Sequence, residues 1–503
     1  MSIDGIISAS AVGSPAIRPT RAAPDEPMTR LAWAPPSRMF EGIEELARRI
    51  NAEIAAGRMT GAAISVAAHG VVISESGFGF ADKASGRAAD SRTPFSLASV
   101  TKPFTTAAIM TLVQEGVMAL DDPIEHYLGD ALPRSVFDSN EMTVRLLGAH
   151  AAGLPSLFDM SRPNHGMPSF DRLMRKYALM AYPAGERYEY ANVGYSLLGE
   201  AGSRATGLSF ASFLREQIIE PMKLSDTFFS ADDSRMSNAA TRYDEFGVAL
   251  PAYATATPPS GELYASVHDL SAFAMQMLGT PLDGADPILG QRFRTDLISP
   301  VFQGDNDAFT CFGWEGSRVA GERVITKLGG QPGASARLTL LPEQGISIAL
   351  VGNRSNNHEL LEELTSHIAS IFIPSWTAPV LEPVRSTYNQ RHLRWYDGVW
   401  TGTLIDDGVT RAVRLRIAGE DSTCMIGEEG PRPISALTAS EGTLEFTSAG
   451  RISLEQSISG TDPILAFKLI EREGRLVGRC LEQTFEPAFS SLLPCIMNLV
   501  RKE

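Results

Sequence analysis

Short β-prone runs stand near both ends of the segment that covers residues 39–373. Two pairs of these runs are each joined by a short turn that contains glycine, which predicts two hairpins, and a fifth run precedes the second hairpin. The runs are residues 62–68, 71–74, 323–327, 336–341 and 346–351. Strands at both ends of one segment predict an antiparallel sheet in which those ends meet.

Longer segments with helical periodicity lie between the two hairpins and after the last strand. Their apolar residues recur every three or four positions, as on one face of an amphipathic helix. They include residues 43–54, 100–115, 194–205 and 358–371. The whole pattern predicts an α+β domain over residues 39–373, with an antiparallel five-stranded sheet flanked by helices.

The pattern changes after a proline-rich segment that we interpret as a linker over residues 374–394. Short strand-like runs now alternate with glycine and aspartate turns, and no long helix interrupts them. The runs are residues 398–404, 412–417, 443–446, 464–470, 476–481 and 496–500. They predict a small antiparallel, barrel-like domain over residues 395–503 without catalytic groups. Residues 1–38, rich in Ala, Ser and Pro, predict an extended N-terminal arm.

Composition narrows the classes of function. Of the 503 residues, 44% are hydrophobic and 20% are charged, which is typical of a globular protein with a large core. The net charge of -15 argues against nucleic acid or an anionic membrane as a partner. The chain has no apolar run of about 20 residues and no basic start of a signal peptide, so we expect a cytoplasmic protein outside the membrane. A periplasmic or secreted protein stays the alternative. Its expected partner is a small-molecule or short-peptide substrate, and its oligomeric state is left open.

The cysteines and histidines do not suggest a metal or a cofactor. The eight histidines form no metal-binding pattern, and the four cysteines have no C-x-x-C spacing. Buried free thiols are favoured, because the cysteines have apolar neighbours. A disulfide between two of Cys424, Cys480 and Cys495 stays an alternative. We therefore expect no metal and no cofactor.

The strongest chemical motif is S-x-x-K, formed by Ser99 and Lys102 at the start of the helical segment 100–115. Residues three apart share a helix face, so Lys102 is expected beside Ser99. A serine hydroxyl is a weak nucleophile until a neighbour takes its proton, and a buried lysine with a lowered pKa is able to take it. The pattern occurs by chance in long chains, but this chain has only seven lysines, which makes a chance match less frequent.

A second motif is Y-x-N, formed by Tyr190 and Asn192. A tyrosine that faces Ser99 and Lys102 could relay a proton to the leaving group, and the asparagine could bind a substrate carbonyl. The alternative is a packed tyrosine and an asparagine that caps the helix at 194–205.

A third motif begins with Lys327 at the end of a predicted strand and ends with Gly330. Glycines there let a substrate approach the backbone closely, and the Gly330 N–H could pair with that of Ser99 as an oxyanion hole. Lys327 could bind a substrate carboxylate. Two alternatives stay open for it, a lysine that tunes the general base and a solvated lysine in a turn.

The order S-x-x-K, Y-x-N and K-x-G closely resembles the serine β-lactamase and penicillin-binding-protein family. Within that family, the chain resembles the class C branch, whose second motif begins with tyrosine. That branch includes β-lactamases, D-aminopeptidases, DD-peptidases and β-lactamase-fold esterases. Further similar stretches lie between about residues 45 and 372. They are residues 120–124, 150–155, 220–227, 266–270, 312–314 and 329–333. The C-terminal domain resembles the small β-barrel that many members carry.

The resemblance implies a role for each matching position. Ser99 would be the nucleophile, Lys102 and Tyr190 would be the acid–base pair, and Asn192 would contact the substrate. Lys327 matches the lysine or histidine of the third motif. His150 also has a counterpart in the family, and we interpret it as structural.

One departure from the pattern bears on the substrate. Leu328 stands where true β-lactamases have a threonine, so the hydroxyl that helps to bind a β-lactam carboxylate is missing. This favours a peptidase, amidase or esterase. The leading hypothesis is a hydrolase of amide or ester bonds in small molecules or short peptides. The alternatives are a carboxylesterase of the same fold and a non-catalytic penicillin-binding sensor or scaffold.

Overall fold

A computed structural model describes residues 38–129, 134–135, 137, 141–156, 160–161, 169–230, 234–383, 392–406, 409–440, 443–450, 452, 463–485 and 490–502. The arm predicted over residues 1–38 lies outside the described residues except for Arg38, which begins the first helix. We call residues 38–373 the α+β body and residues 398–502 the barrel.

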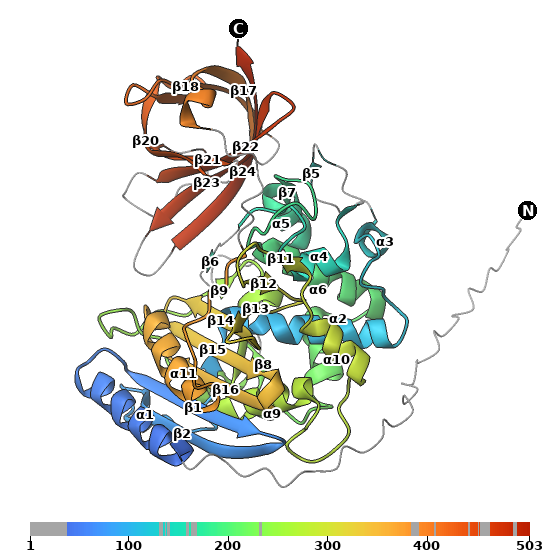
Figure 1. The fold of residues 1–503 in the computed structure, drawn as a ribbon, viewed down its shortest axis with the longest axis vertical. Helices are drawn as coiled ribbons and strands as arrows, with labels where there is room; N and C mark the ends of the chain where they lie inside the picture. The colour runs from blue at the N-terminus through green and yellow to red at the C-terminus, as the bar shows by residue number, and fades with distance from the viewer. Residues whose placement is uncertain are drawn as a thin grey trace, which may run out of the picture.

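One antiparallel sheet of nine strands forms the centre of the α+β body (Figure 1). In spatial order its strands are β11 (Phe302–Gln303), β12 (Phe309–Thr310), β13 (Glu315–Val319), β14 (Glu322–Gln331), β15 (Ala334–Leu341), β16 (Ile346–Gly352), β1 (Gly61–Ala68), β2 (Val71–Asp82) and β3 (Arg87–Ala88). β1 pairs with β16, with Ile64 opposite Leu350, so the two ends of the body meet as predicted.

The predicted fold class is confirmed, and the sheet is larger than the sequence indicated. The five predicted strands form its middle. Three of the four additional strands have two residues each, which is too short for an alternating pattern to appear. The fourth, β13, contains Gly316 and Ser317 in its centre, which weakens its strand pattern.

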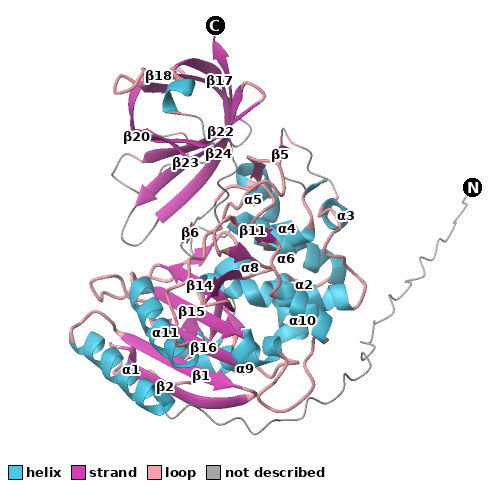
Figure 2. Ribbon diagram, in the orientation of Figure 1, coloured by secondary structure: helices cyan, strands magenta, loops and turns pink. Residues whose placement is uncertain are grey.

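Each face of the sheet packs on its own helices, because successive side chains of a strand point to opposite faces. On one face Ile64 and Leu350 share a core with α1 (Arg38–Ala55) and α11 (His358–Phe372). These two helices also contact each other and cover the same face (Figure 2).

The opposite face carries the larger core. Ala63 of β1 belongs to it, together with α2 (Thr101–Gln114) and α9 (Val267–Leu278). Almost every residue of α2 is buried, and its Phe104 ring stacks on Phe273 of α9 with 3.8 Å between the centroids. A helix that is buried all round is fixed in position, which matters because α2 follows Ser99 directly.

The remaining elements of the body are helices and small sheets. The other helices are α3 (Glu125–Leu128), α4 (Val144–Gly148), α5 (Phe170–Tyr177), α6 (Asn192–Thr206), α7 (Phe210–Leu214), α8 (Pro258–Gly261) and α10 (Gln291–Leu297). Of these, α6, α7, α8 and α10 contact α2. The small sheets are formed by β4 (Phe95–Ser96), β10 (Leu263–Ala265) and β8 (Phe228–Phe229), by β5 (Arg134–Ser135) and β7 (Leu179–Met180), and by β6 (Met160–Ser161) and β9 (Ala254–Thr255).

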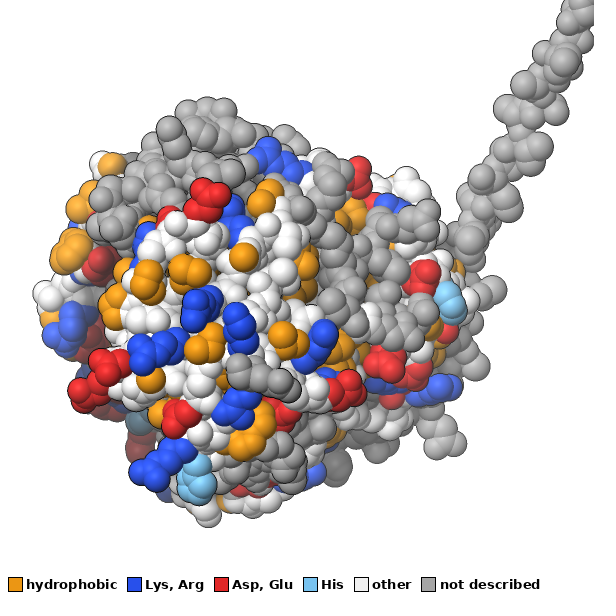
Figure 3. All heavy atoms as spheres, turned by 90° about the horizontal axis from the view of Figure 1, so that it is seen from above, with side chains coloured by type: hydrophobic (Ala, Val, Ile, Leu, Met, Phe, Trp, Pro, Cys, Tyr) orange, Lys and Arg blue, Asp and Glu red, His pale blue; other side chains and the backbone are white. Residues whose placement is uncertain are grey.

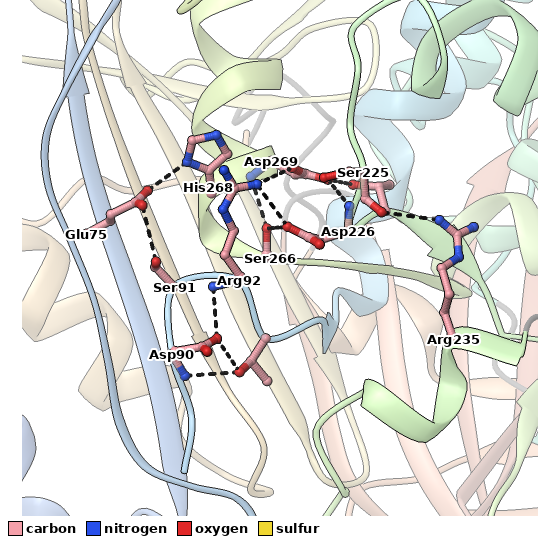
Figure 4. A network of polar contacts seen from close by, with 12 residues as sticks. Glu75, Asp90, Ser91, Arg92, Ser225, Asp226, Arg235, Ser266, His268 and Asp269 are labelled. Carbon is pink, nitrogen blue, oxygen red and sulfur yellow. Dashed lines mark hydrogen bonds and ion pairs between the residues drawn. The ribbon is translucent and has the colours of Figure 1, made fainter. Parts of the chain in front are cut away.

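A polar network ties the loop that leads to β4 to the first turn of α9 (Figure 4). Asp269 accepts hydrogen bonds from Thr227 Oγ1 at 2.8 Å and from the backbone N of Asp226 at 2.7 Å. Arg92 lies 3.2 Å from the carboxylate of Asp226. The network thus holds the loop before β4 in place, and β4 leads directly to the turn that carries Ser99.

The C-terminal domain is a closed eight-stranded antiparallel barrel, so its predicted architecture is confirmed. Its strands are β17 (Gly398–Asp406), β18 (Val409–Ile417), β19 (Thr423–Ile426), β20 (Arg432–Ser440), β21 (Thr443–Ala449), β22 (Ile464–Arg472), β23 (Arg475–Phe485) and β24 (Ser490–Lys502). In β18 the buried Val413 and Leu415 alternate with the exposed Arg414 and Arg416. The sequence missed β19, which is short, and β20, which has small polar residues and a proline at its start.

All four cysteines are buried thiols outside any disulfide, as the sequence favoured. Cys480 of β23 lies opposite Cys495 of β24, and Cys424 belongs to the same core.

The barrel packs on the α+β body beside β7. Ala181 and Tyr182 form a small apolar cluster with Ile470 and Val477 of the barrel, and the Tyr182 hydroxyl donates a hydrogen bond to the backbone O of Lys468 at 3.1 Å. Figure 3 views the molecule from the barrel end, where the described charged side chains of both signs are interspersed with apolar ones. Among the described helices, none has both the length and the apolarity needed to cross a bilayer.

Candidate active site

Ser99 lies on a short 3-10 turn, Ala98–Val100, between strand β4 and helix α2. Ala98 has a φ of 46°, in the left-handed region that residues with a Cβ rarely adopt. Such backbone strain persists only where the surrounding packing enforces it, and it concentrates at functional sites. The strained turn therefore marks Ser99 independently of its sequence motif.

Strand β14 approaches this turn through a glycine. A Cβ built on Gly329 would lie 2.1 Å from the backbone O of Leu97, a distance that no side chain tolerates. The next residue, Gly330, lines the same cavities as Ser99. Glycine at position 329 thus allows the third motif to lie against the first.

The side chain of Lys102 is fully buried, and its Nζ has three oxygen neighbours. Nζ lies 3.1 Å from Ser99 Oγ, 2.7 Å from Asn192 Oδ1 and 3.0 Å from the backbone O of Ser260. Burial, with the nearby charge of Lys327, lowers the pKa of Lys102 well below its usual value. A neutral amine has two N–H donors and one lone pair. Asn192 and Ser260 can accept those two donors, which leaves the lone pair for the Ser99 hydroxyl.

Tyr190 completes the contacts of the serine. Its hydroxyl donates a hydrogen bond to Ser99 Oγ at 2.7 Å. Burial raises the pKa of Tyr190, and the Lys327 ammonium, 4.9 Å from the ring centroid, opposes that increase. Ser99 Oγ therefore lies between a hydroxyl that donates to it and an amine that is able to accept its proton.

His150 supports the segment that carries Tyr190. Its Nδ1 accepts a hydrogen bond from the backbone N of Ala191 at 3.1 Å, and its backbone O accepts one from Glu189 at 2.9 Å. The imidazole lies on the Tyr190 ring with 4.3 Å between centroids. Burial lowers the pKa of His150 well below its ordinary value, so the ring is neutral at physiological pH. This position agrees with the structural role that we assigned to His150 from the sequence.

Lys327 is buried, with 1% of its side chain exposed, and forms an ion pair with Glu315 of β13. Although burial opposes it, the Glu315 carboxylate raises the pKa of Lys327 above its usual value. The alternative of a solvated turn lysine is therefore wrong. Its ammonium lies between Glu315 and Tyr190, which favours an influence on the proton relay over direct binding of a substrate carboxylate.

Asn192 is the first residue of α6, and Ala191 occupies the N-cap position. The alternative of a capping asparagine is therefore also wrong, because the Asn192 side chain is directed to Lys102. Asn192 also lines a cavity beside Ser99, where a substrate carbonyl would meet it.

Two cavities share Ser99, Tyr190 and Gly330. The first, about 210 Å³, is lined mostly by uncharged polar residues, namely Ser156, Asn192, Thr255, Thr257, Ser260 and Gln331. The second, about 400 Å³, is lined by Tyr188, Glu315, Leu328, His358, Leu381 and Glu382. The two cavities therefore meet at Ser99 and differ in the chemistry of their walls.

Sequence reasoning missed several residues around this site. Glu315 and the linker residues Leu381 and Glu382 carry no motif, although Glu315 directly follows the stretch at 312–314 that resembles the family. The Glu189 carboxylate, beside Tyr190 in the chain, accepts a hydrogen bond from Arg479 of the barrel. The expectation that the barrel has no catalytic group stays a prediction, but the barrel does contact the Tyr190 segment.

Comparison with known proteins agrees with this geometry. The sequence model of the Beta-lactamase family matches residues 46–371, which is most of the α+β body.

The chain belongs to the Beta-lactamase family. Among curated relatives, Protein flp of Staphylococcus aureus (strain N315) is 24% identical over 356 residues, which cover 69% of this chain and 70% of that protein. As a member of the Beta-lactamase family, the chain is a serine hydrolase at the level of enzyme class.

Two solved structures are similar in fold. The octameric penicillin-binding protein homologue from Pyrococcus abyssi has a TM-score of 0.55 and 20% identity, and the match covers 90% of this chain and 99% of that one. The D-amino acid amidase from Ochrobactrum anthropi SV3, complexed with D-phenylalanine, has a TM-score of 0.55 and 22% identity, with 68% and 100% covered. The Beta-lactamase fold therefore covers the α+β body, and the first of these similarities extends into the barrel.

Proposed function

We propose that the protein hydrolyses amide or ester bonds of small molecules or short peptides through an acyl-enzyme on Ser99. One observation carries the proposal. Ser99 Oγ lies 2.7 Å from the Tyr190 hydroxyl and 3.1 Å from Lys102 Nζ, and the lysine is buried where its neutral form is favoured. A nucleophile with a proton acceptor within hydrogen-bond distance is what acyl transfer to serine requires.

The acylation step follows from these contacts. Ser99 Oγ attacks the carbonyl carbon of the substrate while its proton passes to the lone pair of Lys102. The carbonyl oxygen takes up negative charge, and the backbone N–H groups of Ser99 and Gly330 would stabilise it. The carbonyl is then re-formed as the bond to the leaving nitrogen or oxygen breaks, and that atom receives a proton from the Tyr190 hydroxyl.

Deacylation repeats the same chemistry with water. A water molecule attacks the ester carbonyl on Ser99 and gives its proton to the acid–base pair. The bond to Ser99 Oγ breaks, and the serine recovers its proton. The products are a carboxylic acid and the free enzyme, and no cofactor is needed to balance the reaction.

Lys327 is placed to act on the relay in this scheme. Its positive charge opposes the increase that burial causes in the pKa of Tyr190, so it favours the transient tyrosinate that remains after proton donation. Asn192 Oδ1 holds Lys102 at 2.7 Å and keeps its amine directed at Ser99.

The experiment is a hydrolysis panel with wild-type enzyme and the Ser99→Ala variant. The panel contains nitrocefin, p-nitrophenyl esters, and D- and L-aminoacyl p-nitroanilides, and D-aminoacyl amides take priority because a structural neighbour is a D-amino acid amidase. We expect Ser99→Ala to lose several orders of magnitude in turnover, as loss of a nucleophile usually causes.

Labelling with a fluorophosphonate separates an enzyme from a scaffold. The wild-type chain should be labelled on Ser99, and Ser99→Ala should not. A variant that keeps more than roughly a tenth of the wild-type rate would refute the nucleophile assignment. Turnover of esters without any amide would leave the carboxylesterase alternative ahead.

A further inference from the structure

Gln331 lies in the wall of the first cavity, directly after Gly330 on β14. Its Nε2 donates a hydrogen bond to Ser96 Oγ of β4 at 2.7 Å, which fixes the orientation of the side-chain amide. The other end of the amide, Oε1, lies beside Gly261, since a Cβ built on that glycine would be 4.0 Å from it. Gly261 also lines the cavity, so Oε1 belongs to the part of the wall that these two residues form.

This oxygen is an accessible acceptor without a donor. Among the described residues, none donates a hydrogen bond to Gln331 Oε1, and the atom is not buried from solvent. The side chain as a whole is only half-buried. A hydroxyl or N–H group that enters the cavity can therefore reach Oε1 and replace water as its donor.

Three hydroxyl groups of the same wall already donate within the protein. The Ser156 hydroxyl donates to the backbone O of Tyr190 at 2.6 Å, and the Ser260 hydroxyl donates to the backbone O of Thr257 at 2.8 Å. Thr257 Oγ1 lies 2.7 Å from Ser260 Oγ, so its own proton is bonded there. A ligand that brings a donor therefore fits this wall better than a ligand that brings only acceptors.

The wall of the first cavity is also uncharged. Among the described residues that line it, none has an ionisable acid or base of the Asp, Glu, Lys, Arg or His type. Lys102 is outside the lining, and burial lowers its pKa well below the usual value. Glu262 is buried, and its two oxygens accept hydrogen bonds from the Thr255 backbone N and from Ser230 Oγ, each at 2.6 Å. An ammonium or carboxylate group in the cavity would lose water without meeting an opposite charge.

We propose that the first cavity binds an uncharged hydroxyl or N–H group of the substrate, with Gln331 Oε1 as its acceptor. This inference rests on the proposed function and names the class of substrate that the same site selects. Gln331 is then a specificity-determining residue, and its bond to Ser96 holds the acceptor in position. A substrate with a free ammonium group at the same place is disfavoured, because the wall has no carboxylate to receive it.

The test uses two series of substrates in which a single group is exchanged. On the acyl side, the 3-hydroxypropanoyl, butanoyl and 3-aminopropanoyl compounds place a hydroxyl, a methyl or an ammonium group at the end of the same chain. On the leaving side, acetyl compounds carry a 2-hydroxyethyl, a propyl or a 2-(dimethylamino)ethyl group. Both series are made as amides or esters, whichever bond the hydrolysis panel shows to be cleaved, and kcat/KM is measured with the full-length chain.

In one of the two series we expect the hydroxyl substrate to exceed the methyl substrate by roughly three- to tenfold, the range of a neutral hydrogen bond that replaces water. The ammonium substrate should be the poorest of the three. In Gln331→Met, which keeps the length of the side chain but has no oxygen, the ratio of hydroxyl to methyl substrate should fall to about one. The ratio is taken within each variant, so a general loss of activity caused by the missing bond to Ser96 cancels.

A second variant should change the preference in favour of charge. Gln331→Glu places a carboxylate at the same position, so the ratio of ammonium to methyl substrate should rise by roughly tenfold or more in that series. Gln291→Met is the matched control, because Gln291 begins α10 on the exposed surface and does not line the cavity. It should leave both ratios unchanged.

Two outcomes would overturn the inference. Ser99-dependent hydrolysis without a preference for the hydroxyl substrate in either series, or with a preference that persists in Gln331→Met, would reject the donor site and leave the proposed function standing. If no substrate were hydrolysed and no fluorophosphonate label appeared on Ser99, the proposed function would fail, and the donor site would fail with it.

Discussion

The Glu189 carboxylate, one residue before Tyr190 in the chain, is bound by Arg479 of the barrel. Arg479 Nε donates to Glu189 Oε1, and Lys468 Nζ lies 3.7 Å from Oε2. Glu189 is buried, and its backbone N is bonded to His150. The Tyr190 segment is therefore held from the body by His150 and from the barrel by Arg479.

We predict that Arg479→Ala lowers kcat by roughly tenfold or more while KM changes little, because a displaced Tyr190 harms a step after binding. Removing one partner of a buried ion pair also costs about 3–5 kcal/mol of stability, so the melting temperature should fall. Steady-state kinetics below the melting transition measure the effect on kcat.

Two further variants serve as controls. Arg479→Lys should restore part of kcat, and Arg475→Ala, at an exposed arginine on the same strand, should behave as wild type. Unchanged kcat in a less stable Arg479→Ala would show a structural role alone.

The pKa of Lys102 predicts a pH dependence of catalysis. Burial holds this pKa well below its usual value, and only the neutral amine accepts the Ser99 proton. The value of kcat/KM should therefore rise with pH through the lowered pKa and then level off. Lys102→Arg keeps a positive charge at every accessible pH and should lose at least about a hundredfold in activity without such a rise. The exposed Lys223→Arg is the control, and an unchanged pH profile in Lys102→Arg would reject the general-base role.

Asp269, in the network of Figure 4, predicts a pH dependence of stability. Burial raises its pKa from 3.8 to about 6 in the folded protein, and the nearby Asp226 adds to the increase while His268 opposes it. Since the folded state binds the proton more tightly, this contribution is fully present below pH 3.8 and is lost as pH rises through about 6. The difference corresponds to about 3 kcal/mol.

The measurement is the thermal midpoint of wild type and Asp269→Asn at several pH values between about 3 and 7, a range that brackets the two pKa values. As pH rises, wild type should lose stability relative to Asp269→Asn, because the amide never acquires the charge. Parallel curves for the two proteins would contradict the raised pKa. A curve with the opposite slope would mean that Arg92 and the hydrogen bonds outweigh burial.

Gly329→Ala tests the contact between β14 and the nucleophile turn. The added Cβ would meet the backbone O of Leu97 at 2.1 Å, so either the strand or the turn must move. A displacement near 1 Å at a reacting group costs on the order of a hundredfold in rate. We expect that loss in kcat/KM with the fold retained by circular dichroism. Gly430→Ala, where the new Cβ meets nothing within 4 Å, should be neutral.

The sequence predicted the parts of this protein that follow from local spacing. Ser99 and Lys102 are three residues apart on one turn, so their proximity follows from helical geometry. The five central strands and six of the barrel strands have alternating or apolar patterns that identify them without any tertiary information.

Contacts between distant residues could not be derived in this way. Glu189 and Arg479 are 290 positions apart, and neither belongs to a motif that names the other. Glu315 lies only 12 positions before Lys327, but its pairing depends on the register of β13 against β14, and β13 has too weak a pattern to be recognised.

The pairing of β1 with β16 has a consequence for biosynthesis. All eight residues of β1 are buried, and the strand that covers one of its edges is completed only at Gly352. At about 5–20 residues per second, a ribosome would leave that apolar edge without its partner for roughly 15 to 60 seconds. An exposed edge of this kind is a template for pairing with other chains. During that interval the nascent polypeptide is open to mispairing along β1, however stable the finished enzyme is.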